Sequence, residues 1–199
     1  MHNVAVIVGS IRKASYNREL ARALAVLAKG KLNFRLIRID DLPLLNQDDV
    51  GDPPNQVLRF KEEVEQCSAV LFVTPEHNRG IPAALKNAFD WGTRPWGRDS
   101  WKGKAAAIIG TSEGAVSTAL AQQNMRTIAS GHVGALLGAP DAFIRYREGL
   151  FENDGTVTDA GVREFLQIFI DRFASLIDAL ERQRQEQSQS SRRRAVSSV

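Results

Sequence analysis

Short apolar runs alternate with amphipathic helical patterns along most of this chain, and the alternation restricts the fold more than any other feature. Strands are predicted at 3–8, 34–39, 69–74, 105–110 and 133–137. Helices are predicted at 18–28, 56–66, 82–91, 116–129 and 159–182, where Thr158 or Asp159 would supply the N-cap of the last one. Alternation of this kind indicates right-handed crossovers and a parallel sheet that is covered on both faces.

Five strands with five helices fit an α/β fold: a doubly wound, five-stranded parallel sheet with helices on both faces. The expected strand order is 2-1-3-4-5, which is the flavodoxin-like order. Ligands of open parallel sheets bind beyond the carboxyl ends of the strands, where the strand order reverses. The loops after the first, third and fourth strands (9–17, 75–81 and 111–116) are therefore expected to meet at one place.

Length and composition fit one globular domain with a core of ordinary size, since 43% of the 199 residues are hydrophobic and 25% are charged. We assign this domain to residues 1–182. Residues 183–199 are rich in Arg, Ser and Gln without an apolar face, so they are expected to form a frayed helix end or a disordered tail. The apolar runs are far shorter than the ~20 residues of a membrane span. No signal peptide precedes the first run, so a cytoplasmic location is expected.

The positive net charge belongs to the tail. Residues 182–199 hold five arginines and one glutamate, a net charge of +4, whereas the whole chain carries +3 and the rest therefore −1. A near-neutral body does not indicate a nucleic-acid-binding face. The tail itself could attach to nucleic acid, but its composition favours a solubilising terminus.

Two further residue types are informative. Cys67 is the single cysteine, which excludes an internal disulfide, and it is expected to be buried on the apolar side of a helix; the three histidines lack metal-ligand spacing. The segment 91–101 contains three tryptophans. We interpret this segment as a lid or a subunit contact, with core packing as the alternative.

The loop after the first strand combines the features of an anion site. A helix N-terminus offers unpaired N–H groups and a partial positive charge, to which an arginine can add a charged contact. The loop lacks the three glycines of a dinucleotide site and the Gly-Lys-Ser/Thr of a P-loop, so it suits a terminal monophosphate. The alternative is an ordinary turn with Ser15 or Asn17 as N-cap and a solvated Arg12. The candidate residues are Gly9, Ser10, Arg12, Ser15, Tyr16 and Asn17.

The other two loops carry weaker signals. The second, at 75–82, is stiffened by prolines and could line a flat heteroaromatic ring. The third contains Ser112 and Gly114, which can bring a hydroxyl and backbone amides to a carbonyl or a ring nitrogen. Taken alone, the second loop is better explained as a plain polar connection, and the glycine-bracketed turn of the third is an ordinary feature.

Together these segments resemble the NAD(P)H-dependent FMN reductase family, in particular its chromate/quinone reductase branch. The resemblance rests on Gly-Ser-x-Arg-x-x-Ser-x-Asn at 9–17 and Pro-Glu-x-Asn at 75–78, and it extends over about residues 3–180. The second motif continues into Gly80-Ile81-Pro82, Leu85-Lys86-Asn87 and Asp90-Trp91. The resemblance implies non-covalent FMN, with NADPH or NADH as co-substrate.

The resemblance also implies a set of cofactor-binding residues. Side chains or backbone groups of Ser10, Arg12, Ser15, Tyr16 and Asn17 would hold the FMN phosphate. The isoalloxazine ring would be bordered on one margin by Pro75, Glu76, His77 and Asn78, and on the other by Ser112 and Gly114. Related proteins often have tyrosine at the position of His77. No acid, base or nucleophile of the protein is expected.

The activity implied is a ping-pong, two-electron reduction of quinones or similar small acceptors, such as free flavin, azo compounds or chromate. A homo-oligomer, either a dimer or a tetramer, is implied as well. The alternative is an electron carrier of the flavodoxin type without substrate turnover. Such carriers are usually strongly acidic, which the near-neutral body does not match.

Overall fold

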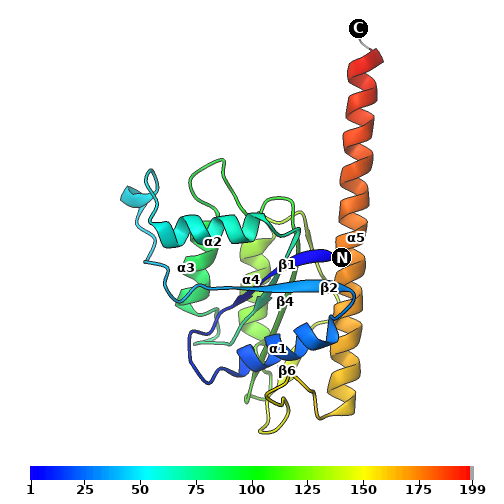
Figure 1. Ribbon diagram of the computed structural model, residues 1–199. Helices are drawn as coiled ribbons and strands as arrows, with labels where there is room; N and C mark the ends of the chain where they lie inside the picture. The colour runs from blue at the N-terminus through cyan, green and yellow to red at the C-terminus, as the bar shows by residue number, and fades with distance from the viewer. Residues whose placement is uncertain (198–199) are drawn as a thin grey trace.

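The computed structural model describes residues 1–197, which form a sheet enclosed between two helical layers (Figure 1). The sheet has the order β2-β1-β3-β4-β5, and all of its pairs are parallel. The strands are β1 (His2–Val8), β2 (Leu32–Ile37), β3 (Ala69–Val73), β4 (Ala105–Ser112) and β5 (Ala135–Leu136). The predicted fold and strand order are confirmed.

A sixth strand extends the sheet at its carboxyl edge. This strand, β6 (Phe143–Arg145), pairs in parallel with the end of β4, where β5 has already stopped. It was not predicted, because three residues are too few to show a period. Its pairing lengthens the sheet on the side where the functional loops lie.

Two hydrophobic cores hold the layers together, because the central strands bury side chains on both faces. Val4, Val6 and Val8 of β1 face a core shared with α1 (Tyr16–Leu27) and α5 (Ala160–Ser197). Ala5 and Ile7 face the opposite core. That core is covered by α2 (Asn55–Glu65), α3 (Ala83–Gly92) and α4 (Ala119–Ala129), and a short 3-10 turn at Gln47–Asp49 precedes α2.

Helix ends follow their capping residues. Ser15 is the N-cap of α1, since its hydroxyl accepts a hydrogen bond from the Arg18 N–H at 3.3 Å. Asp159 caps α5, since its carboxylate accepts from the Val162 N–H at 2.9 Å. The fourth helix begins at Ala119 rather than at residue 116, because the preceding residues form a turn.

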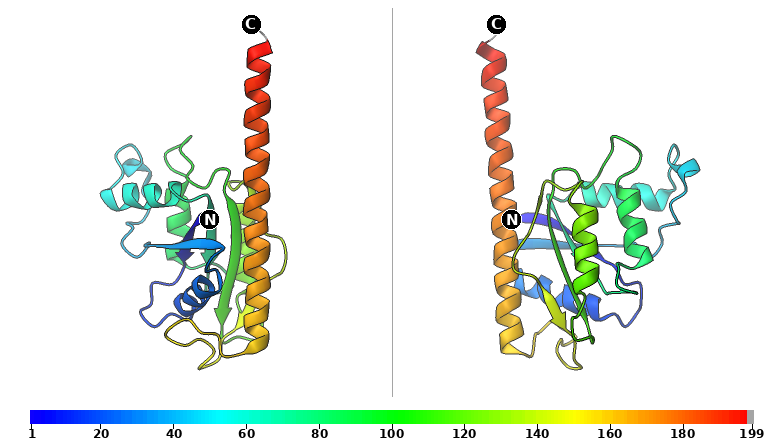
Figure 2. Two further views of the ribbon diagram at one scale, coloured as in Figure 1. Left: turned by 45° about the vertical axis from the view of Figure 1, so that its right-hand side comes forward. Right: turned by 180° about the vertical axis from the view of Figure 1, so that it is seen from behind.

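The last helix is longer than expected. It continues beyond Arg182 to Ser197, and both views of Figure 2 show it projecting past the rest of the molecule. Arg184 still donates to the carbonyl oxygen of Gly103 on the domain. The frayed or disordered tail expected for residues 183–199 is thus helical as far as Ser197, which suits the helix propensity of its Gln, Arg and Glu residues. The domain limit at residue 182 stays a prediction.

The tryptophan-rich segment lies at the amino-terminal edge of the sheet, because α3 carries the chain back from the carboxyl edge before β4 begins. Trp91 and Trp101 are fully buried, and their ring N–H groups donate to carbonyl oxygens of Pro43 and Phe89 at 2.8 and 2.9 Å. The prediction of a lid is therefore wrong, and core packing is correct for these two residues. Trp96 is 92% exposed, so a subunit contact stays a prediction for it alone.

Two other properties bear on the expectations above. Cys67 is buried, as expected. Among residues 1–197, no helix combines the length and apolar character needed to cross a membrane.

Candidate functional site: a cavity at the carboxyl ends of the strands

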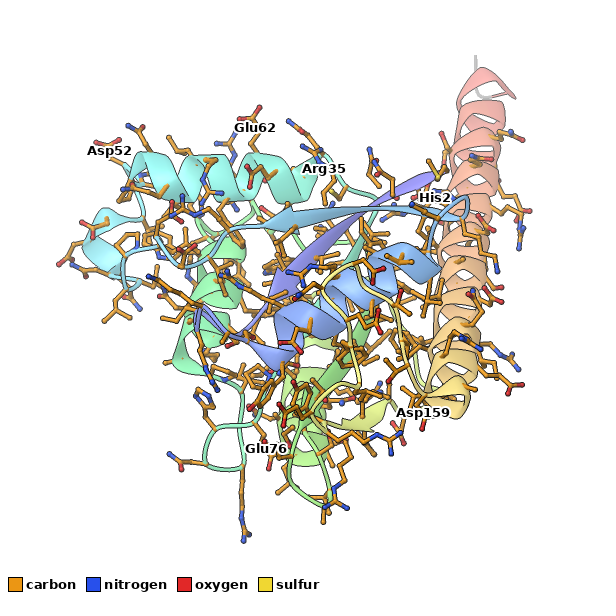
Figure 3. All side chains as sticks on the ribbon, turned by 60° about the horizontal axis from the view of Figure 1, so that its bottom comes forward. His2, Arg35, Asp52, Glu62, Glu76 and Asp159 are labelled. Carbon is orange, nitrogen blue, oxygen red and sulfur yellow. The ribbon has the colours of Figure 1, made fainter. Side chains whose placement is uncertain are left out.

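The three candidate loops meet around one cavity of about 560 Å³, called here the first cavity. Figure 3 looks onto this side of the molecule, with Glu76 labelled in the second loop. Ten of the predicted site residues line the cavity: Gly9, Ser10, Arg12, Ser15, Tyr16, Asn17, Pro75, Glu76, His77 and Ser112. The three loops therefore meet as predicted, and their residues differ in the contacts that they make.

The first loop leads from β1 into the N-terminus of α1. Gly9 donates its N–H to the Val73 carbonyl at 2.8 Å, and a Cβ at this position would lie only 3.1 Å from a methyl carbon of Leu85. Ser15 then caps the helix. The first helical turn leaves the backbone N–H groups of Tyr16 and Asn17 without partners inside the helix. These groups and the helix dipole favour an anion at this end of the cavity.

The Asn17 side chain has a structural task. Its amide donates to the Thr111 carbonyl at 2.9 Å and accepts from the Thr111 N–H at 3.0 Å, and the residue is only 2% exposed. Both ends of the amide are thus used to tie the first loop to β4. The predicted contribution of Asn17 to a phosphate site is restricted to its backbone N–H.

The second loop contains a tight hairpin. His77 and Gly80 exchange two backbone hydrogen bonds of 3.0 Å, and Asn78 and Arg79 both have positive φ angles, 48° and 64°. This is the geometry of a type I′ turn, in which Asn is favoured. Asn78 therefore lies at the tip of the hairpin and not among the residues that line the first cavity. Its predicted place beside a flavin ring stays a prediction.

Glu76 joins the second loop to α4. Its carboxylate accepts from the N–H groups of Leu120 and Ala121, both at 3.0 Å, while Thr118 at the N-cap position makes no side-chain capping bond. A negative charge at a helix N-terminus is stabilising. Glu76 lines the cavity, and its carboxylate positions the loop.

The third loop leaves β4 at Ser112. The Ser112 carbonyl accepts from the Tyr146 N–H at 2.8 Å, which joins the loop to the segment after β6. Gly114 lies in the following turn, where its carbonyl accepts from the Ser117 N–H at 3.0 Å. Gly114 is not among the residues that line the first cavity, and its predicted contact stays a prediction.

Two aromatic side chains stack where the first loop meets the segment after β6. The rings of Tyr16 and Tyr146 stack with centroids 3.7 Å apart, and the Arg12 guanidinium lies 5.3 Å from the centre of the Tyr16 ring. The Tyr16 hydroxyl donates to Glu113 at 3.4 Å. Burial and the nearby Glu19 carboxylate raise the pKa of Tyr146, so its hydroxyl stays protonated at neutral pH. The Tyr16 ring thus holds Arg12 near the N-terminus of α1.

Six residues of the cavity wall were missed by sequence reasoning: Ile11, Pro82, Ala83, Ala84, Thr111 and Glu113. Ala83 and Ala84, which follow Pro82 at the start of α3, could have been predicted to line the cavity, because small residues permit the close approach of a ring. Thr111 gave no signal, although it is informative in the structure. Its buried hydroxyl has no hydrogen-bond partner among residues 1–191, the part of the chain with described side chains.

Comparisons with known proteins point to one family. The NADPH-dependent FMN reductase family matches residues 2–145. A quinone reductase of Pseudomonas putida is 44% identical over 178 residues, which cover 89% of this chain and 95% of that protein. A 2-hydroxy-1,4-benzoquinone reductase of Burkholderia sp. is 41% identical over 174 residues, covering 87% and 95% of the two chains.

A solved structure shows the same architecture. The flavoenzyme NAD(P)H:(acceptor) oxidoreductase FerB of Paracoccus denitrificans superposes with a TM-score of 0.87 at 45% sequence identity. The match covers 90% of this chain and 98% of that one. The likeness therefore extends over most of both chains.

Proposed function

This chain belongs to the NADPH-dependent FMN reductase family, and we propose that it is an NAD(P)H-dependent quinone reductase with FMN in the first cavity. Family and relatives support the reaction class, since the matched relatives are quinone reductases over nearly their full length. The residues that line the first cavity would hold the cofactor.

The observation that carries the proposal is a set of hydrogen-bond donors around the first cavity that the fold leaves unused. The backbone N–H groups of Tyr16 and Asn17 lie at the helix end, and the buried Thr111 hydroxyl has no partner among the described residues. Buried polar groups are otherwise almost always satisfied. Donors at one end and a wall of Pro, Ala and His side chains at the other fit a phosphorylated flat ring.

Each part of the cavity would do a different task. The N-terminus of α1, with Arg12 and Ser10, would bind the phosphate. Pro75, Pro82 and the hairpin stiffen the ring-binding wall, so little reorganisation accompanies binding. Bound FMN supplies the two-electron chemistry, and the protein supplies orientation and electrostatics.

We propose that NAD(P)H and the acceptor occupy the same open cleft in turn, in a ping-pong sequence. Quinones are the proposed acceptors, and free flavin, azo compounds and chromate are further candidates of the same kind. A homo-oligomer, dimer or tetramer, and a cytoplasmic location complete the proposal. The exposed Trp96 supports a subunit contact, because large exposed aromatic side chains are typical of interfaces.

The test is a visible spectrum of the purified protein, followed by consumption of NADPH and NADH in the presence of 1,4-benzoquinone. A yellow protein that oxidises a nicotinamide nucleotide in a quinone-dependent way is expected. A colourless protein that FMN cannot reconstitute contradicts the cofactor assignment. A yellow protein that oxidises neither nucleotide favours the flavodoxin-type carrier instead.

A further inference from the structure

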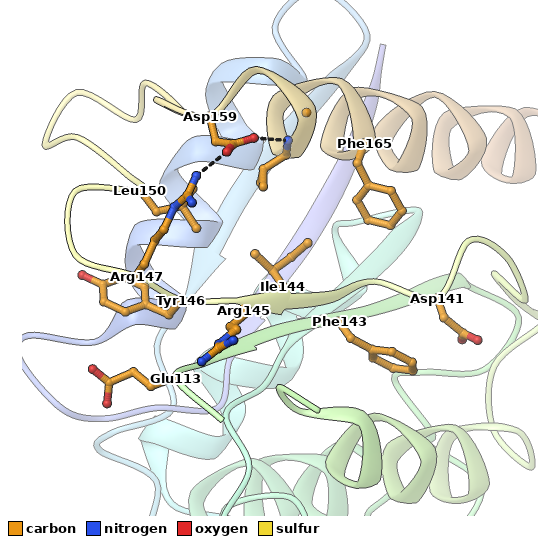
Figure 4. A pocket seen from close by; sticks show the side chains of 12 residues that line it. Glu113, Asp141, Phe143, Ile144, Arg145, Tyr146, Arg147, Leu150, Asp159 and Phe165 are labelled. Atoms are coloured by element: carbon orange, nitrogen blue, oxygen red, sulfur yellow. Dashed lines mark hydrogen bonds and ion pairs between the residues drawn. The ribbon is translucent and has the colours of Figure 1, made fainter. Parts of the chain in front are cut away.

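A second cavity, of about 760 Å³, adjoins the first at the same edge of the sheet (Figure 4). It is lined mainly by β6, by the segment after β6 and by the first turn of α5. Glu113 lines both cavities, and the stacked rings of Tyr16 and Tyr146 belong one to each. In the pairing of β4 with β6, Arg145 lies directly beside Ser112, a residue of the first cavity. A ligand too long for the first cavity can therefore extend into the second.

Most charges of the second cavity are already paired. Arg147 donates to Asp159, which also caps α5, as the dashed lines in Figure 4 show. Asp141 pairs with Arg126 at 3.2 Å. Glu113 accepts the hydrogen bond of Tyr16.

Arg145 is different from its neighbours. Its exposed guanidinium makes no ion pair or side-chain hydrogen bond among residues 1–191, whose side chains the structure describes. The second cavity thus offers one cation whose five N–H donors are all available.

An aromatic ring stands next to this cation. Phe143 and Arg145 are two positions apart on β6, so their side chains lie on the same side of the strand, roughly 7 Å apart along it. Figure 4 shows both on one side of β6 and Ile144 on the other. Phe143 is 43% exposed, although it is a large apolar residue. A free guanidinium beside an exposed aromatic ring suits a nucleotide, in which a ribose joins a planar base to a phosphate.

We propose that the second cavity binds the adenosine half of NADPH, with the adenine against Phe143 and the 2′-phosphate on Arg145. The inference rests on the proposed function, because that function makes NADPH a substrate whose nicotinamide end occupies the first cavity. NADH lacks the 2′-phosphate, so Arg145 gives this chain a preference for NADPH. The preference was not readable from the sequence, because Arg145 lies outside the three loops that the sequence predicts to meet.

The direct test is a calorimetric titration of the purified protein with adenosine 2′,5′-bisphosphate and, separately, with adenosine 5′-monophosphate. The bisphosphate is expected to bind about tenfold or more tightly, the usual effect of one charged contact. Arg145→Gln removes this difference, and Arg145→Lys restores part of it. Arg163→Gln is the matched control, because Arg163 is exposed on the first turn of α5 and does not line the cavity. The proposal is overturned by equal affinities for the two nucleotides, or by equal effects of Arg145→Gln and Arg163→Gln.

A kinetic measurement gives an independent readout. In Arg145→Gln the ratio of kcat/KM for NADPH to kcat/KM for NADH is expected to fall about tenfold, whereas Arg163→Gln keeps the wild-type ratio. An unchanged ratio in Arg145→Gln contradicts the proposal. A wild-type protein that oxidises neither nucleotide refutes the proposed function instead, and the calorimetric titration then still decides whether Arg145 binds the 2′-phosphate.

Discussion

Asn17 and Thr111 are joined by two hydrogen bonds, in which the Asn17 side chain pairs with the backbone N–H and carbonyl of Thr111 at 3.0 and 2.9 Å. The two residues lie 94 positions apart. This pair fixes the first loop against β4 and therefore sets the distance between two walls of the first cavity.

Removing the Asn17 amide is expected to destabilise the fold. Asn17→Ala leaves a buried N–H and a buried carbonyl without partners, which costs about 2–4 kcal/mol of the free energy of unfolding. Urea denaturation measures this loss. Asn33→Ala is the control, because Asn33 makes one exposed side-chain hydrogen bond, to Asn3. Equal stability of the two variants would show that the Asn17–Thr111 pair does not hold the loops together.

Arg12 is expected to contribute to FMN affinity and little to stability. Its guanidinium is exposed and lies over the Tyr16 ring, at the end of the first cavity proposed to bind the phosphate. Arg12→Ala should weaken FMN binding by about 1.5–3 kcal/mol, measured by quenching of flavin fluorescence. Lys13→Ala removes a charge from the same loop at a residue that does not line the cavity. If both variants bind FMN as tightly as the wild type, Arg12 has no phosphate role.

Glu76 is expected to stabilise α4 through its charge. Glu76→Gln keeps an acceptor for the Leu120 and Ala121 N–H groups but removes the charge at the helix N-terminus. A loss of about 0.5–1 kcal/mol in the free energy of unfolding is expected. Glu164→Gln, an exposed position on α5, serves as the control. If Glu76→Gln has the same free energy of unfolding as the wild type, the charge of Glu76 does not stabilise α4 and its hydrogen bonds alone hold the loop.

The cap of α5 should make stability depend on pH. Hydrogen bonds from the Val162 N–H and then from Arg147 lower the pKa of Asp159 below its ordinary value. A carboxylate with a lowered pKa in the folded state stabilises the fold at neutral pH, and this stabilisation is lost as the pH falls below about 4.

Asp159→Asn should therefore have a lower Tm than the wild type at pH 7, and the difference should shrink toward pH 3. Thermal melts followed by circular dichroism measure it. Glu152→Gln is the control at an exposed acidic residue in the loop before α5 that caps no helix. A Tm difference that stays constant from pH 7 to pH 3 would rule out a charged cap.

The parts of this protein that could be predicted from sequence are those governed by local pattern. Continuous apolar runs such as 69–73 revealed buried strands, since both faces of each strand are covered. The helices predicted between these strands indicated a parallel sheet. In a parallel sheet the loops after the first, third and fourth strands lie at the same edge. The residue types of the first loop then indicated an anion site.

The remaining features depend on partners that are distant in the sequence. Glu76 was assigned to the flavin margin by its motif. Its hydrogen-bond partners on α4 lie 44 and 45 positions away, and they give its carboxylate a positioning role. Asn78 was assigned to the cavity by its motif, whereas in the structure it lies at the tip of a tight hairpin that the motif did not reveal. Trp101 looked like an interface residue because aromatic content alone does not reveal which edge of the sheet α3 reaches. The second cavity depends on β6, which is too short to leave a pattern.

The position of the phosphate is tested most directly by a crystal structure of this protein grown with FMN. The phosphate group should lie within hydrogen-bond distance of the Tyr16 and Asn17 backbone N–H groups, with the flavin ring between the second and third loops. A phosphate bound elsewhere, or a first loop left empty in excess FMN, would contradict the account.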